Sequence, residues 1–221
     1  MPIQVPVTER VEHLWAMLET QRPQVAEHSR RVSMLAVRLA SQYGLSAQAI
    51  DSIRLGALLH DVGKLFVAPR ILEKGARLSR REWEELAGHP EVGVELADRA
   101  GATHEACEII LYHHERHDGQ GYPDRMANSA IPWPVRIVSM MDAFDTLTSP
   151  SAHREPLSID GARAFIVRRA GTQFCPWVVS GLLSMPLSML DTSTIGERKF
   201  CIPDGLVACD VLVMDTFVPA L

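Results

Sequence analysis

The stretch of residues 58–64 changes abruptly from apolar side chains to His60, Asp61 and Lys64. An imidazole beside a carboxylate offers two strong neighbouring ligands to a divalent cation, and a carboxylate can also bridge two ions. If residues 49–63 are helical, the His60–Asp61 pair ends the buried stripe and points inward. The alternative is a buried helix end whose two polar side chains are only hydrogen-bonded. The other histidines decide between these interpretations.

Further side chains with metal-binding chemistry stand on predicted helix faces or at helix ends. His28 shares its face with the apolar Val32 and Leu35, and Asp142 lies one turn after Val138. A buried carboxylate is unfavourable unless it is paired or bound to a metal. The complete set of candidate ligands is His28, His60, Asp61, His89, His113, His114 and Asp142. Each alone has an ordinary explanation as a core or capping residue, but all seven, carried by five predicted helices of one small domain, favour a site for two metal ions.

These side chains must be positioned by helices, because apolar residues recur at helical spacing through most of the chain. The expected helices cover residues 8–20, 23–43, from a cap at Ser46 to His60–Asp61, 79–88, from His89 onward, 103–115, 135–147, 158–170 and 176–185. Ser79 and Glu82 form a capping-box pattern. Residues 67–77, with Pro69 and Gly75, are predicted to be a loop. The sequence therefore predicts an all-α domain.

Two other segments are expected to be non-helical. The loop after His114 contains Gly119 and Gly121, which permit close approach of the backbone. Residues 186–199 are expected to be a linker, and residues 200–221 a short β-rich tail of two or three strands that looks truncated. Two or three strands are not stable alone and need an apolar surface to lie on. We therefore expect the tail to pack against the helical domain or across a homodimer contact.

Composition limits the classes of function. The chain has 221 residues, of which 47% are hydrophobic and 22% charged, as in ordinary globular proteins. The net charge of −5 and the lack of long basic runs exclude general binding to polymeric nucleic acid. No apolar run is long enough to span a membrane and no signal peptide is recognisable, so a cytoplasmic location is expected. The four cysteines have no CxxC spacing, which favours reduced thiols.

The order of His28, His60–Asp61 and Asp142 resembles the HD-domain phosphohydrolase superfamily. The longer pattern is similar to its HD-GYP subfamily, the cyclic di-GMP phosphodiesterases, over roughly residues 8–185. The matching segments are EHSRRV at 27–32, LHDVGK at 59–64, HP at 89–90, HHERHDGQGYP at 113–123, IP at 131–132, RIV at 136–138, DAFD at 142–145 and GTQF at 171–174. The resemblance implies an HD-domain-like bundle of about seven to nine helices.

The resemblance also implies roles for single residues. One ion is expected at His28, His60, Asp61 and Asp142, and a second at Asp61, His89, His113 and His114, with Asp61 bridging. Lys64 corresponds to a catalytic lysine beside the scissile phosphate, and Arg154 to a phosphate-binding arginine. Tyr122 lies in the loop that lines the substrate groove. Iron or manganese is the implied metal, although mixed histidine and carboxylate sites accept several ions.

Three positions depart from the family pattern. Gln24 stands where some relatives place a carboxylate that holds a third metal, which favours two ions here. Ser151 replaces an arginine that commonly precedes the position of Arg154, and Cys175 replaces the aspartate that usually follows Phe174. These two changes concern substrate affinity and a helix-end contact more than the metal site.

The expected function is hydrolysis of cyclic di-GMP to linear pGpG or GMP by a metal-bridging hydroxide. A second hypothesis is a non-catalytic module that binds cyclic di-GMP, or a signalling protein through the GYP loop. A third is an HD hydrolase acting on another nucleotide, which the GYP loop disfavours. The full ligand set favours the enzyme, because a module without catalysis has no need of seven metal ligands. The native metal, the end product, the regulatory input and the oligomeric state are left open.

Overall fold

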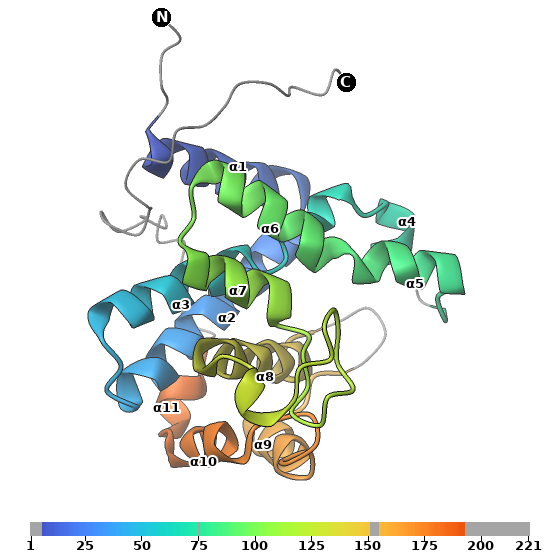
Figure 1. The fold of residues 1–221 in the computed structure, drawn as a ribbon. Helices are drawn as coiled ribbons and strands as arrows, with labels where there is room; N and C mark the ends of the chain where they lie inside the picture. Colours follow the sequence, from blue (N-terminus) through green and yellow to red (C-terminus); the bar gives the residue numbers. More distant parts are fainter. Residues whose placement is uncertain (1–5, 75, 151–154, 193–221) are drawn as a thin grey trace, which may run out of the picture.

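The computed structural model describes residues 6–74, 76–150 and 155–192, and these ranges are almost entirely helical (Figure 1). Its longer helices are α1 (Val7–Gln21), α2 (Pro23–Gln42), α3 (Ala47–Leu59), α5 (Arg80–Ala87), α6 (His89–Ala100), α7 (His104–Tyr112), α8 (Trp133–Thr148), α9 (Ile159–Val167) and α10 (Pro176–Ser184). The single-turn helices α4 (Pro69–Leu72) and α11 (Leu187–Leu190) and the 3-10 helices η1 (Val62–Phe66) and η2 (Asn128–Ala130) complete the set. The described part contains isolated β-bridges but no strand, which confirms the all-α prediction there. The predicted β-rich tail at 200–221 lies outside the described residues.

Helix starts follow the capping residues in the sequence. The side chains of Ser46, Ser79, Thr103 and Ser158 each accept a hydrogen bond from a backbone N–H in the first turn of α3, α5, α7 and α9. At Ser79 the reciprocal bond from Glu82 is also present, so the predicted capping box is confirmed. Each such cap stabilises its helix by about 1 kcal/mol. The caps therefore fix where the chain enters the helices that lead to the candidate ligands.

Helix α3 lies between two apolar clusters. Its Ile53 and Ala57 pack with side chains of α2, α8, α9 and α10, whereas its Leu55, Leu58 and Leu59 pack with α1, α6 and α7. The second half of the helix, from Leu55 to Leu59, is thus apolar and buried all round, whereas its first half carries the partly exposed Asp51 and Arg54. Because α3 ends between the two clusters, the residues that follow it, His60 and Asp61, are also buried.

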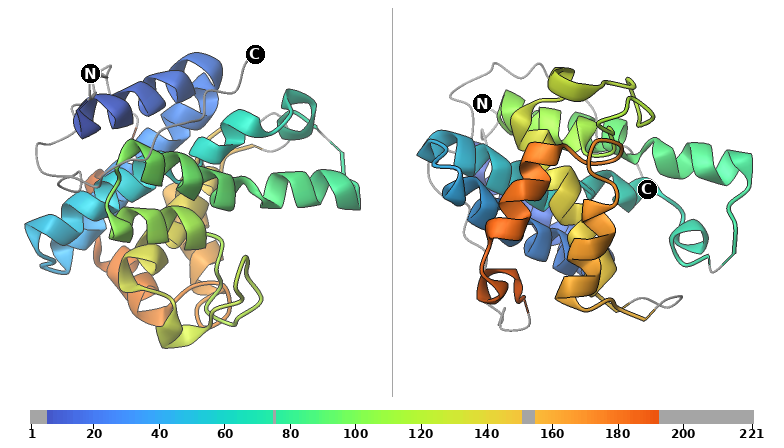
Figure 2. Two further views of the ribbon diagram at one scale, coloured as in Figure 1. Left: turned by 45° about the horizontal axis from the view of Figure 1, so that its top comes forward. Right: turned by 90° about the horizontal axis from the view of Figure 1, so that it is seen from below.

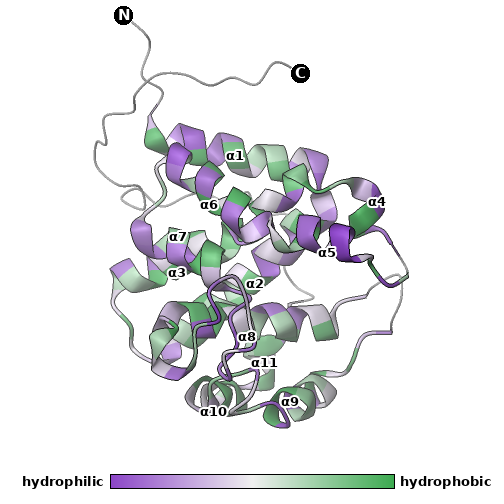
Figure 3. Ribbon diagram, turned by 45° about the vertical axis from the view of Figure 1, so that its right-hand side comes forward, coloured by the Kyte–Doolittle hydropathy of each residue, from purple (hydrophilic) through white to green (hydrophobic). Residues whose placement is uncertain are grey.

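The helices are arranged with α1 at one end of the molecule and α9, α10 and α11 at the other (Figures 1 and 2). Helix α5 projects from the body and is strongly hydrophilic, while α8 and α10 carry mainly apolar residues (Figure 3). Where η1 meets α6, the backbones touch: a Cβ added to Gly63 would lie 1.9 Å from the carbonyl oxygen of His89. Among the described residues, no helix is long and apolar enough to cross a bilayer.

Some predicted elements need correction. Residues 67–77 were expected to be a loop, but Pro69–Leu72 forms α4, because Pro69 at the first helical position favours one turn of helix. The helix predicted at 158–170 ends at Val167, and a turn follows it. Within the expected linker, Leu187–Leu190 forms α11 and Leu190 is buried in the core. Single-turn helices give no periodic signal, which explains why α4 and α11 were missed.

Candidate metal centre

All seven candidate ligands converge where α2, α3, α6, α7 and α8 meet. His28 lies on α2, the His60–Asp61 pair follows α3, and His89 is the first residue of α6. His113 and His114 follow α7, and Asp142 lies on α8. Three groups have ligand atoms within 4.8 Å of one another: His28, His60 and Asp142; His60, Asp61 and His113; and His89, His113 and His114. The arrangement is one continuous cluster rather than scattered polar residues.

Asp61 occupies the middle of this cluster. Its Oδ1 lies 3.2 Å from Nε2 of His89 and 3.9 Å from Nε2 of His113, and its Oδ2 lies 3.4 Å from Nε2 of His60. The Asp61 side chain is almost fully buried. Burial alone would raise the pKa of this carboxyl, but Lys64 and His60 hold the pKa well below its usual range. Asp61 is therefore an ionised carboxylate whose two oxygens face opposite halves of the cluster.

Three histidines are oriented by the helices that precede them. The Nδ1–H of His60 donates to the carbonyl of Ala57 at 2.7 Å, and those of His89 and His113 donate to the carbonyls three residues earlier, at 2.7 and 2.8 Å. A carbonyl only accepts hydrogen bonds, so in the neutral imidazole the proton is on Nδ1 and the lone pair is on Nε2. In each case Nε2 faces the cluster, as metal-binding histidines require.

Three inward-facing side-chain atoms have no hydrogen-bond partner among the described residues. His60 Nε2, Asp61 Oδ1 and His114 Nε2 are buried without a hydrogen bond among the described residues. Nε2 of His89 lies 3.3 Å from Nε2 of His113, so these two ring nitrogens converge on the same space. Burial lowers the pKa of His113 well below its usual value and that of His114 to about 4. Neutral imidazoles with converging lone pairs fit a divalent cation, since a buried polar atom otherwise needs a partner.

His28 is held differently from the other histidines. Its Nδ1–H donates to Asp145 at 2.7 Å and its Nε2–H to Asp142 at 3.0 Å. Burial opposes its charge, but the hydrogen bonds to Asp142 and Asp145 outweigh burial and raise the pKa of His28 to about 9. Asp145 in turn accepts from Nε and Nη2 of Arg31 at 2.7 and 2.9 Å. An ion at this end must therefore displace the proton on His28 Nε2.

Asp145 was not predicted to have a role at the site. The signal was available, because Asp145 lies one turn after Asp142 on α8 and Arg31 lies one turn after His28 on α2. Both pairs therefore share a face, and the two faces meet. Gln173 was also missed. It lines both pockets beside the cluster, and only the fold brings it there.

The cluster opens to a groove of about 580 Å³. Its lining includes His28, Asp61, Lys64, His114 and Asp142, together with Gln24, Phe165 and Gln173. Lys64 Nζ donates to Asp61 Oδ2 at 2.6 Å, so an ammonium group stands at the edge of the candidate ligands. A second pocket of about 280 Å³ shares His114, Asp142 and Gln173 with the groove and includes Tyr122. A phosphate ester in this groove would meet both Lys64 and the cluster.

The loop after His114 is built on its two glycines and on Glu115. Gly119 has a φ of 74°, and a Cβ on Gly121 would come within 2.5 Å of the Arg116 backbone nitrogen, so the predicted close approach is confirmed. The buried Glu115 accepts from the backbone N–H of Asp124 at 2.7 Å. The loop thereby places Tyr122 against His114, with ring centres 4.7 Å apart and planes at 24°.

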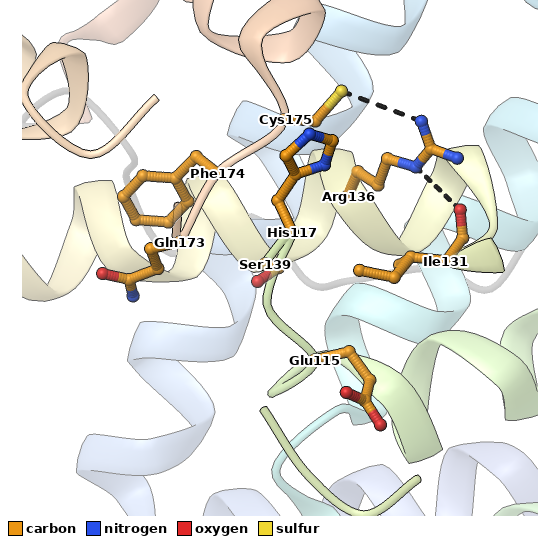
Figure 4. A pocket seen from close by; sticks show the side chains of 8 residues that line it. All are labelled: Glu115, His117, Ile131, Arg136, Ser139, Gln173, Phe174 and Cys175. Carbon is orange, nitrogen blue, oxygen red and sulfur yellow. Dashed lines mark hydrogen bonds between the residues drawn. The ribbon is translucent and has the colours of Figure 1, made fainter. Parts of the chain in front are cut away.

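Of the three sequence departures, Gln24 lines the groove, and the other two have different outcomes. Ser151 and Arg154 lie outside the described residues. Cys175 directly precedes α10 and gives it no side-chain cap, and its Sγ lies 3.7 Å from Nη1 of Arg136 (Figure 4). Arg136 also donates from Nε to the carbonyl of Ile131 at 2.7 Å. Cys175 and Cys107 are buried free thiols, as expected for reduced cysteines.

Comparisons with known proteins agree with this geometry. The HD domain family model matches residues 12–178. The chain is 34% identical over 177 residues to 3'3'-cGAMP-specific phosphodiesterase 2 of Vibrio cholerae, covering 79% of this chain and 34% of that protein. It is 37% identical over 157 residues to the cyclic di-GMP phosphodiesterase response regulator RpfG of Xanthomonas campestris, covering 69% of this chain and 41% of that protein. The chain therefore belongs to the HD domain family, and it spans less than half the length of these two relatives.

Solved structures show the same fold. The crystal structure of a V. cholerae cyclic GMP-AMP specific phosphodiesterase superposes with a TM-score of 0.61 at 21% identity, covering 80% of this chain and 48% of that one. The HD domain of the Listeria monocytogenes phosphodiesterase PgpH gives 0.58 at 15% identity, covering 80% of this chain and 94% of that one. At these identities the likeness establishes the helical HD architecture alone.

Proposed function

We propose that this chain is the catalytic domain of an HD-GYP phosphodiesterase that hydrolyses cyclic di-GMP with two divalent metal ions, iron or manganese. The observation that carries this proposal is the central, ionised Asp61, whose two oxygens face opposite groups of histidine nitrogens. One ion would be held by His28, His60, Asp61 and Asp142, and the other by Asp61, His89, His113 and His114. Two such ions would lower the pKa of bound water and stabilise the charge that develops at phosphorus.

The residues of the chain supply orientation and charge. The Nδ1–H bonds to helix carbonyls fix His60, His89 and His113 before any ion binds, so little reorganisation is needed. Lys64 would donate to the non-bridging oxygens of the phosphate, because it lies beside Asp61 at the groove. Arg154, by its correspondence to the family arginine, would bind a phosphate as well. Burial of the Tyr122 phenol raises its pKa, so it is protonated at neutral pH and serves as a neutral wall of the groove.

Cyclic di-GMP is the proposed substrate, although relatives are named for activity on cyclic di-GMP and on 3'3'-cGAMP. The test is anaerobic purification, metal analysis and incubation with both dinucleotides. We expect about two equivalents of iron or manganese and conversion of cyclic di-GMP to pGpG or GMP. Asp61→Ala should lose metal and turnover, while the exposed Asp98→Asn should retain both. A metal-loaded protein that binds cyclic di-GMP without cleaving it would instead support the non-catalytic module, and cleavage of 3'3'-cGAMP alone would reassign the substrate.

A further inference from the structure

Trp83 is out of keeping with the helix that carries it. Helix α5 has the sequence RREWEELA and no buried residue, and it is among the most hydrophilic elements of the fold (Figure 3). The indole of Trp83 is nevertheless 49% exposed. A large aromatic side chain on a charged helix is not explained by packing in the core, and an indole buries its area at low entropic cost when a ligand covers it.

The position of Trp83 is fixed by polar contacts that hold α5 to the preceding segment. Lys74 Nζ lies 2.6 Å from Oε2 of Glu82, and the backbone N–H of Ala68 donates to Oε1 of Glu85 at 3.2 Å. The capping box at Ser79 orders the first turn of the same helix. Trp83 is thus held in place by polar contacts of α5 rather than by burial of its own ring.

From this position Trp83 faces the candidate metal centre through Tyr122. The Trp83 and Tyr122 ring centres are 5.9 Å apart with planes at 75°, and Tyr122 stacks on His114 at 4.7 Å. Trp83, Tyr122, His114 and Asp142 line the same pocket of about 280 Å³. One aromatic ring therefore separates the exposed indole from a candidate metal ligand.

The pocket combines this aromatic wall with polar groups suited to the edge of a base. Gln120 and Gln173 line it together with Trp83, and so does Arg116, whose Nε and Nη2 donate to Asp118 at 3.0 and 2.7 Å. Glutamine side chains pair with the hydrogen-bonding edges of purines, while every base offers a face for stacking.

We propose that the exposed face of Trp83 stacks on a purine base of the dinucleotide and so sets the affinity of the site for its nucleotide substrate. This inference rests on the proposed function, because the base must belong to the molecule whose phosphate lies at Lys64 and the metal centre. Trp83 is a substrate-binding residue in this scheme and takes no part in the chemical step.

The expected effect follows from the energetics of stacking. Loss of one base–aromatic contact lowers affinity by between about fivefold and about 150-fold. Trp83→Ala should therefore raise the KM for cyclic di-GMP, and the Kd of GMP, within that range, with kcat changed much less. Trp83→Phe should retain part of the affinity because phenylalanine also offers a stacking face. Metal content should be the same in both variants.

The experiment compares wild type, Trp83→Ala, Trp83→Phe and Trp177→Ala, all metal-loaded. Trp177 is a matched control, since its indole is 75% exposed and α10, the helix that carries it, lies away from α5 (Figure 1). Kinetics with cyclic di-GMP are measured alongside calorimetric binding of GMP and hydrolysis of methyl p-nitrophenyl phosphate, a diester without a purine. We expect only the Trp83 variants to lose nucleotide affinity, and all four proteins to cleave the simple diester equally.

Three results would overturn the inference. If Trp83→Ala binds GMP and cyclic di-GMP like wild type while wild type hydrolyses cyclic di-GMP, the base lies elsewhere and the proposed function stands. If Trp83→Ala loses metal, or cleaves the simple diester more slowly, Trp83 has a structural role instead. A metal-loaded wild type that neither binds nor hydrolyses cyclic dinucleotides refutes the proposed function and the stacking role together.

Discussion

Replacing Asp145 by asparagine should weaken metal binding at His28 without touching a proposed ligand. The Asp145 carboxylate is fully buried and accepts from His28, twice from Arg31 and from Ser149 Oγ at 3.2 Å. An asparagine has nearly the same shape but only one acceptor oxygen and no charge. Its amide NH2 would face a donor of either His28 or Arg31, so the imidazole would either lose its acceptor or keep only a neutral one.

Two magnitudes follow from these contacts. Breaking a buried ion pair by changing one partner costs about 3 to 5 kcal/mol. The lower end applies here, because the side chains of His28 and Arg31 remain 17% and 16% exposed and can be partly hydrated. We therefore expect Asp145→Asn to lower the free energy of unfolding of the metal-free protein by about 3 kcal/mol. Loss of a hydrogen-bond partner behind a metal ligand typically lowers metal affinity about 10- to 100-fold, and we expect a loss of this size for the ion at His28.

The assay is calorimetric titration of metal-free protein with Mn²⁺, with urea unfolding in parallel. The titration is run at about pH 8.5. The pKa of His28 is raised to about 9, and at lower pH its proton competes more strongly with the ion. The binding event assigned to His89, His113 and His114 should be unchanged and serves as an internal reference. Asp98→Asn, a surface carboxylate change, is the matched control. Wild-type stability and two unchanged binding events in Asp145→Asn would refute the view that Asp145 orients His28.

Three further predictions use other features of the fold. Gly63→Ala should destabilise the protein by about 3 kcal/mol or more and reduce its metal content, because the added Cβ would meet the His89 backbone. Gly88→Ala is the control, since its Cβ would meet nothing closer than 3.6 Å. Urea unfolding and metal analysis of both variants test this, and a stable, fully metal-loaded Gly63→Ala would contradict it. Lys64→Ala should keep both ions and lower kcat/KM for cyclic di-GMP about a hundredfold, and unchanged kinetics would place the phosphate elsewhere. Burial raises the pKa of the Cys107 thiol to about 11, so Cys107 should resist alkylation at neutral pH until the protein is unfolded. Peptide mass spectrometry measures the labelling, and rapid labelling of the native protein would argue against burial of this thiol.

Local features of the site could be predicted from the sequence. His28 lies on the buried stripe of α2 with Val32 and Leu35, because a 3.6-residue period fixes which side chains share a face. The caps at Ser46 and Ser79 are likewise local, since each side chain bonds a backbone N–H three residues ahead. Such predictions depend only on neighbours in the chain, and the structure confirms them.

Features that depend on distant segments could not be predicted. The direction of each Nε2 toward the cluster follows from how α3, α6 and α7 cross, which no spacing specifies. The contact of Trp83 with Tyr122 joins residues on α5 and the later loop, and the roles of Asp145 and Gln173 require α2, α8 and the segment before α10 to meet. Periodicity reports which face is buried, but it carries no information on which other face it meets.

The backbone contact between Gly63 and His89 also bears on how this sequence can drift. Because His60 and Gly63 lie only three residues apart, an insertion or deletion between them would move the glycine away from the backbone of His89, where α6 approaches. The described residues between α4 and Ser79, in contrast, are mostly exposed, and changes of length are tolerated in such surface chain. Relatives of this chain should therefore vary in length between η1 and α5 while keeping the interval from His60 to Gly63 fixed.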